Sequence, residues 1–202
     1  LREELVTLGQ QFDDNIASDV RTLELDPSDL DGLPDDFKRG HPVGANGKVT
    51  LTTNNTDYQP FMTYSSSPTA RSAFWKLYRL RGHPKNVPVL ERMLEARQEL
   101  AGVLGYATWA DYITGDKMIA TRQNVADFID RIVAAADKRM KADYAVLLAR
   151  RQRDVPGATF VDAWDNAYYS EKVKAEQYNF DSQSVRPYFE YSRVKAGVMD
   201  IT

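Results

Sequence analysis

The chain has 202 residues, of which 43% are hydrophobic and 27% charged, and its formal net charge at pH 7 is −3. The absence of cysteine excludes a disulfide scaffold, a cysteine-rich zinc site, an iron–sulfur cluster and a thiol nucleophile. With only two histidines and no basic excess, the sequence offers little material for a histidine-based metal site and no global signature of nucleic-acid binding.

The sequence shows neither the pattern of a membrane span nor, at its first residues, that of a signal peptide. No apolar run approaches the roughly 18 residues of a membrane span, so we expect no membrane partner. The opening residues Leu1-Arg2-Glu3-Glu4 lack the basic-then-apolar pattern of a signal peptide. Because the chain starts without Met and stops at Thr202 without a helix stop signal, we expect both ends to be cuts.

The first segment predicts an amphipathic helix whose pattern extends to Val20 and Leu23, before Asp26-Pro27 interrupts it. Its apolar residues recur at steps of three and four, as one face of a helix requires: Leu1, Leu5, Leu8, Phe12 and Ile16. A turn or a single helical turn follows at residues 28–34, and Pro34 opens a short helix.

One small β-ribbon is predicted near residues 48–64. A loop rich in Gly and Pro at residues 41–47 precedes alternating β-branched residues at 48–52, which predict a strand. A turn at residues 54–57 leads to a second predicted strand at residues 58–64, which Pro60 interrupts.

Helical signals dominate the rest of the chain. We predict helices at residues 68–81, 86–104, 108–115, 121–155, 159–174 and 185–201. Ser67-Pro68 is a typical helix start, and Gly82 and Gly105 are typical helix ends. A turn is expected at Asn179-Phe180-Asp181 and a break in the last helix at Gly197. The predicted fold class is mainly α, with residues 1–66 holding the first helices and the ribbon, and residues 67–202 forming a helical region.

Most catalytic patterns are missing. His41 and His83 are 42 residues apart and lie in predicted loops, whereas two histidines on one helical face need about four residues between them. We therefore expect no metal ligand and no catalytic residue in this chain. The sequence also contains no Gly-x-Ser-x-Gly elbow and no phosphate-binding glycine loop.

The long helix at 121–155 carries many cations, interleaved with aspartates. They are Arg131, Lys138, Arg139, Lys141, Arg150, Arg151 and Arg153. Interleaved signs predict a solvated helix face, and an anionic partner such as RNA is the alternative reading.

Aromatic residues gather at Trp164-Asp165-Asn166-Ala167-Tyr168-Tyr169. At helical spacing, such residues are typical of a core or a domain interface. Asp165 and Tyr169 share a face with polar tips, so this face could line a cleft and hold a ligand. Asp165, Tyr168 and Tyr169 are therefore the candidate cleft-lining residues.

Several motifs in a fixed order resemble one enzyme family. They include Arg97-x-Glu99-x-Ala101, Leu104-Gly105-Tyr106, Ala110-Asp111 and Lys117-Met118, preceded by Asn86 and followed by Trp164-Asp165 and Tyr188-Phe189. In this order and spacing the set resembles the zinc metallopeptidases of the thimet oligopeptidase type, which include oligopeptidase A and the bacterial peptidyl-dipeptidases. The resemblance covers nearly the whole chain and implies a multi-helix, neurolysin-like fold.

The resemblance also implies what this chain lacks. In that family a helix bearing His-Glu-x-x-His binds zinc, and the motif's Glu acts as the general base toward a zinc-bound water. No such motif occurs here, so no metal or catalytic residue is carried over. The resemblance implies an N-terminal to middle portion that forms part of the substrate-channel wall. It also implies zinc and short-peptide substrates for the parent enzyme, and no zinc bound by this portion alone.

Two further expectations follow. Apolar residues of the last helix, near Tyr188, Phe189 and Val194, should pack against the missing catalytic half, so alone this chain should self-associate. We expect a cytosolic protein, with the periplasm open because the N-terminus has the character of a cut. The alternative function is a stand-alone helical binding or scaffolding module without catalysis, which a stop codon directly after Thr202 would favour.

Overall fold

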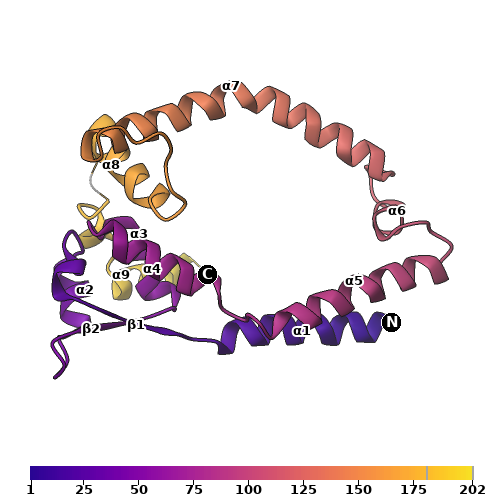
Figure 1. Cartoon of the computed structure of the whole chain (residues 1–202), viewed down its shortest axis with the longest axis horizontal. Helices are drawn as coiled ribbons and strands as arrows, with labels where there is room; N and C mark the ends of the chain where they lie inside the picture. The colour runs from indigo at the N-terminus through magenta and orange to yellow at the C-terminus, as the bar shows by residue number, and fades with distance from the viewer. Residues whose placement is uncertain (181, 202) are drawn as a thin grey trace. The chain divides into compact units, whose positions relative to one another are not determined.

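The computed structural model of the chain describes residues 1–180 and 182–201. Helices account for most of these residues, and two short strands form one sheet (Figure 1), which confirms the mainly α fold class. In chain order the elements are α1 Arg2–Ser18, β1 Thr22–Leu25, η1 Pro27–Leu30, α2 Asp35–Gly40, β2 Val49–Thr52, α3 Asn55–Tyr64, α4 Pro68–Arg79, α5 Asn86–Val103, α6 Trp109–Thr114, α7 Arg122–Asp154, α8 Asn166–Tyr178, η2 Arg186–Phe189 and α9 Tyr191–Ile201.

The sheet confirms one predicted strand, but the strand that pairs with it is not the predicted one. β2 lies where alternation predicts a strand, but it pairs with β1, in a region where we expected the first helix to continue. Helix α1 instead ends at Ser18. Thr53 fixes the register, because its backbone N–H donates to the Arg21 carbonyl at 2.8 Å and its hydroxyl accepts the Arg21 N–H at 2.9 Å.

The second predicted strand is wrong, because residues 55–64 form helix α3 with Pro60 inside it. Tyr58, Phe61 and Met62 are all buried, and their spacing of three and four residues belongs to a helix rather than a strand. Pro60 costs the helix one N–H donor, and the burial of this face offsets the loss.

Two boundaries near the C-terminus also differ from expectation. Helix α8 begins at Asn166 rather than at residue 159, because Arg151 and Tyr144 bind the backbone of Phe160 and Val161 in an irregular segment. The last helical region breaks at Glu190 rather than at Gly197. There the Glu190 carboxylate accepts the backbone N–H groups that begin α9. Of the turn expected at residues 179–181, Asp181 lies outside the described residues.

The chain divides into two interleaved compact units; four of the five boundaries between them fall inside β1, β2, α4 and α7, and the fifth lies directly before α3. Unit 1 comprises residues 1–22, 52–54 and 76–143, and unit 2 comprises residues 23–51, 55–75 and 144–202. The division into domains at residues 66 and 67 stays a prediction. In the described part of the chain, no helix combines the length and the apolar character that crossing a bilayer demands.

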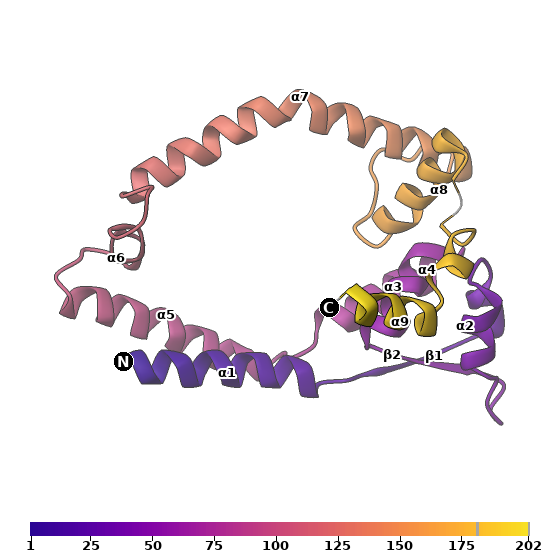
Figure 2. The ribbon, with the colours of Figure 1, turned by 180° about the vertical axis from the view of Figure 1, so that it is seen from behind.

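Unit 1 is built on α1, which lies alongside α5 in both views of the ribbon (Figures 1 and 2). Asn86, at the start of α5, joins the helices: its amide donates to the Phe12 carbonyl at 2.9 Å and its side-chain oxygen accepts from Asn15 at 2.8 Å. Farther along, Arg92 forms an ion pair with Glu4 at 2.6 Å.

Unit 2 has an aromatic core. Phe74 of α4 is fully buried, and its ring meets those of Tyr58 and Phe61 edge-on at centroid separations of 5.4 and 5.3 Å. Leu51 of β2 is buried as well, so the strand contributes its alternate side chains to the interior. This core fixes α4, and α4 in turn carries the most deeply buried charge of the molecule's described part.

Candidate functional site

The three candidate residues lie together at the start of α8. Asp165 directly precedes the helix, and Tyr168 and Tyr169 belong to its first turn. Their exposed fractions are 2%, 9% and 3%, respectively. The two tyrosine rings meet edge-on at 5.2 Å. The three residues thus lie together in the interior of unit 2.

Arg71 of α4 is the partner of Asp165, and its side chain is only 1% exposed. Its Nε donates to Asp165 Oδ1 at 3.1 Å and its Nη2 donates to the same oxygen at 2.6 Å. Its Nη1 donates to the Ser65 carbonyl, and the guanidinium lies 4.1 Å from the centre of the Tyr168 ring. All three nitrogens of the group are thus engaged, which is what a buried arginine requires.

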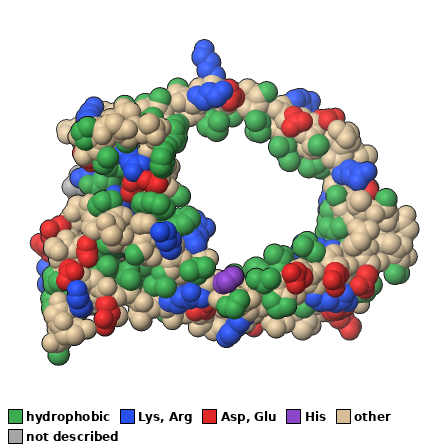
Figure 3. Space-filling model, viewed as in Figure 1, with side chains coloured by type: hydrophobic (Ala, Val, Ile, Leu, Met, Phe, Trp, Pro, Cys, Tyr) green, Lys and Arg blue, Asp and Glu red, His purple; other side chains and the backbone are tan. Residues whose placement is uncertain are grey.

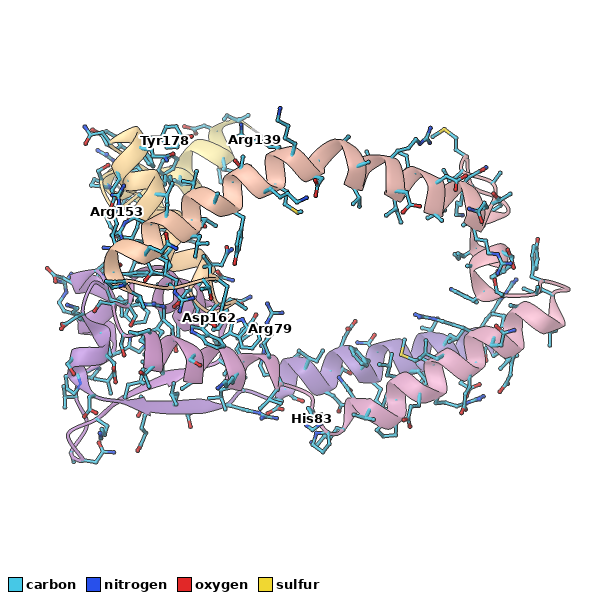
Figure 4. The ribbon with its side chains drawn as sticks, turned by 45° about the horizontal axis from the view of Figure 1, so that its top comes forward. Arg79, His83, Arg139, Arg153, Asp162 and Tyr178 are labelled. Atoms are coloured by element: carbon cyan, nitrogen blue, oxygen red, sulfur yellow. The ribbon has the colours of Figure 1, made fainter. Side chains whose placement is uncertain are left out.

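A second arginine, Arg151 of α7, reaches the same carboxylate. It donates to Asp162 Oδ2 at 2.6 Å and to the Phe160 carbonyl, and it lies 3.5 Å from Asp165 Oδ2 (Figure 4 labels Asp162). Its Nε is buried without a hydrogen-bond partner among the described residues. We name Arg71, Arg151, Asp162 and Asp165 the buried charge cluster; two cations and two carboxylates balance within it.

Tyr169, beside the buried charge cluster, is held in its neutral form. Burial raises the pKa of the Tyr169 hydroxyl above its usual range, and the nearby carboxylates of Asp154 and Asp165 add to the increase. The ring stays uncharged because an anion in this surrounding would lose hydration and face two carboxylates.

The cluster is suited to holding segments together rather than to turning over a substrate. It ties α4 to the start of α8 and to α7, and the polar atoms of Arg71 and Asp165 are used within the chain. That Asp165, Tyr168 and Tyr169 line a cleft stays a prediction.

Sequence reasoning missed Arg71 and placed Arg151 among solvated cations. The signal for Arg71 was its position: it lies three residues before the fully buried Phe74, on the apolar side of α4. An arginine inside an apolar stripe predicts a buried carboxylate partner. The partners of Arg151 were missed because residues 159–174 were predicted as one helix, whereas Phe160 and Asp162 lie in an irregular segment before α8.

Neither histidine is placed to bind zinc. His41 has its Nδ1 2.8 Å from the Phe37 carbonyl and its Nε2 3.2 Å from Asp57 Oδ1, whereas His83 lies in the turn between α4 and α5 (Figure 4). Among the described residues, no group of three or more His, Asp or Glu side chains is arranged to hold a metal ion. The residues present here do not fit a zinc site, which needs at least three protein ligands.

Comparison with known proteins defines the class. Residues 61–202 match the model of Peptidase family M3. The chain is 29% identical over 98% of its length to Oligopeptidase A of Salmonella typhimurium, and 25% identical over its whole length to the Probable thimet oligopeptidase of Arabidopsis thaliana. It is also 32% identical over 98% of its length to Mitochondrial intermediate peptidase 2 of Cryptococcus neoformans.

The match is that of a peptidase, and the chain belongs to Peptidase family M3. The resemblance seen in the ordered motifs is thereby confirmed. The chain spans only part of these relatives, 31%, 28% and 26% of their lengths, respectively.

Proposed function

We propose that this chain is part of a zinc-dependent oligopeptidase that hydrolyses short peptides, and that its helices form part of the wall of the substrate channel. Family membership over residues 61–202 carries this proposal. It is supported by relatives that bear the name oligopeptidase and match nearly the full chain.

In this proposal, the zinc ion and the general base belong to the part of a family-length protein that these 202 residues do not contain. The relatives are about three times as long as the matched segment, which leaves ample sequence for a catalytic half. Zinc lowers the pKa of a bound water to about 7 and polarises the peptide carbonyl. The chain alone is therefore expected to be inactive.

The proposal also assigns the start of α8 to the channel wall. Asp165, Tyr168 and Tyr169 are buried, so they would set the shape of that wall rather than offer free polar groups to a peptide. Tyr169→Phe in the family-length protein tests this: we expect KM to change and kcat to stay within about twofold. A change in kcat alone would argue against a role in the wall.

The main test compares two lengths of the protein on a quenched fluorescent peptide of roughly ten residues. The family-length gene product should cleave it, lose activity with a chelator and regain it with zinc. The 202-residue chain should not cleave it under any of these conditions. Cleavage by the short chain would overturn its inactivity. A reading frame that ends with this chain would instead favour the stand-alone binding module.

Self-association belongs to the same proposal. The last segment exposes Tyr188, Phe189, Tyr191 and Met199, each at 69% or more. Such a concentration of apolar surface is typical of a contact site. We expect the 202-residue chain to sediment as a dimer or larger species at high concentration, and the family-length protein to sediment as a monomer. A monomeric short chain would contradict this. We further propose a cytosolic location, which cell fractionation tests.

A further inference from the structure

Helix α7 carries a row of large apolar side chains that the described chain leaves uncovered. Figure 3 shows hydrophobic side chains along α7. We name this row the bare face of α7; it consists of Phe128, Ile129, Ile132, Val133 and Met140, which are 49–59% exposed. No residue of the 33-residue helix is fully buried, although Arg150 and Arg151 near its C-terminal end come close, at 12% and 14% exposed.

The row is one side of the helix. Spacings of one, three, one and seven residues keep its members within a stripe. The charged residues of the same stretch lie mainly on the other side, where Lys141 pairs with Asp137 at 2.8 Å. Arg139, at the edge of the stripe, pairs with Asp143 at 2.9 Å. The polar side thus satisfies its charges in water, whereas the apolar side has no cover.

We infer that the bare face of α7 is the docking surface for the two thirds of a family-length protein that lie outside these 202 residues. This inference rests on the proposed function. The occupant follows from two observations: the relatives supply about twice as much additional chain as is present here, and the two charged residues that fall within the stripe, Arg139 and Asp143, pair with each other at 2.9 Å. A partner that complements such a row must be apolar itself, as the interior of a larger fold is.

An uncovered helix opens more readily than a covered one, since helical stability in proteins comes mostly from packing of an apolar face. Trypsin reports this opening at Lys138, Arg139 and Lys141, which flank Met140 at the end of the row (Figure 4 labels Arg139). Cleavage there tracks the population of the open helix when cleavage is slow relative to reclosing.

The experiment compares cleavage at these three sites in the 202-residue chain and in the family-length protein. We expect cleavage at least about tenfold slower in the family-length protein. Ile132→Asp should raise it about tenfold there and less than about twofold in the short chain. Arg131→Asp is the matched control, because Arg131 is the neighbouring residue on the polar side; it should change neither chain by more than about twofold.

Ile132→Ala provides the same comparison if the aspartate variant of the long protein does not fold. Equal cleavage in both lengths overturns the inference. So does a short chain whose dimer dissociates with Ile132→Asp but not with Arg131→Asp, because a second copy would then cover the face. Zinc-dependent peptide hydrolysis by the unmodified family-length protein is measured separately. An active enzyme whose α7 is cleaved as fast as in the short chain overturns only this inference. Slow cleavage of α7 in an inactive protein overturns only the proposed function.

Discussion

The two ends of helix α7 show opposite relations between residue type and burial. In its C-terminal part, which belongs to unit 2, the side chains of Arg150 and Arg151 are only 12% and 14% exposed. In its N-terminal part, which belongs to unit 1, Phe128 and Ile132 are 49% and 53% exposed. Burial along a single helix is therefore decided by which segments pack against it, and two arginines can be better covered than a phenylalanine.

The covered end depends on charge pairing, and breaking the buried charge cluster should have the largest effect. Asp165→Ala removes the carboxylate that Arg71 and Arg151 share. It leaves Arg71 buried without a counter-charge, so we expect a loss of about 3–5 kcal/mol in the free energy of unfolding of unit 2. Urea denaturation followed by tryptophan fluorescence measures it, because Trp75 and Trp164 both belong to unit 2.

A double variant separates pairing from packing. Arg71→Met combined with Asp165→Leu replaces both charges by apolar groups, and we expect it to recover most of the stability that Asp165→Ala loses. If the double variant is as unstable as the single one, the cluster acts through shape rather than charge.

A pair of phenylalanines tests the comparison directly. Phe74→Ala empties a fully buried position against Tyr58 and Phe61, and we expect a loss of about 3–5 kcal/mol. Phe128→Ala in the 202-residue chain makes the same chemical change on the bare face of α7 and should cost less than about 0.5 kcal/mol. Thermal and urea unfolding of both variants are the measurements. Equal losses would mean that α7 is covered in the short chain.

The smallest predicted effect is a pH dependence in unit 1. A hydrogen bond from Arg21 and another from the Gly82 N–H lower the pKa of Asp19 from 3.8 to about 2. Because the folded-state pKa is the lower one, the stabilisation is complete above pH 3.8 and is lost as the pH falls toward 2.

The variant Asp19→Asn has no carboxyl group at this position, so it lacks this pH-dependent contribution to stability. Between pH 6 and pH 2.5 we expect the urea midpoint of the unmodified chain to fall farther than that of Asp19→Asn. Asp13→Asn, at an exposed position of α1, is the control and should follow the unmodified chain. Parallel decreases in all three proteins would refute a contribution from Asp19.

Much of the helical architecture follows from the sequence, because apolar spacing and end residues are local signals. The predicted start of α4 at Ser67-Pro68 and the predicted end of α5 before Gly105 agree with the structure, in which Gly105 has a φ of 82°. The N-terminal part of α7 was equally predictable. Its apolar residues recur with a regular helical period, which does not depend on whether another segment packs against them.

Pairings between segments distant in sequence could not be predicted from local sequence patterns. Strand β1 forms where the helical pattern fades, and what makes it a strand is β2, more than twenty residues later. Residues 58–64 favour a strand by composition, yet the core against Phe74 requires a helix. The candidate residues at the start of α8 are close in sequence, so their proximity needs no long-range information. Their partner Arg71 lies 94 residues earlier, beyond the reach of any local pattern.

That long separation matters while the protein is being made. At about 5–20 residues per second, the ribosome adds Asp165 roughly 5–20 s after Arg71. During that interval α4 emerges with a cation on its apolar side and no carboxylate to neutralise it. The interior of unit 2 around Arg71 can therefore be completed only late in synthesis, after Asp165 has been added.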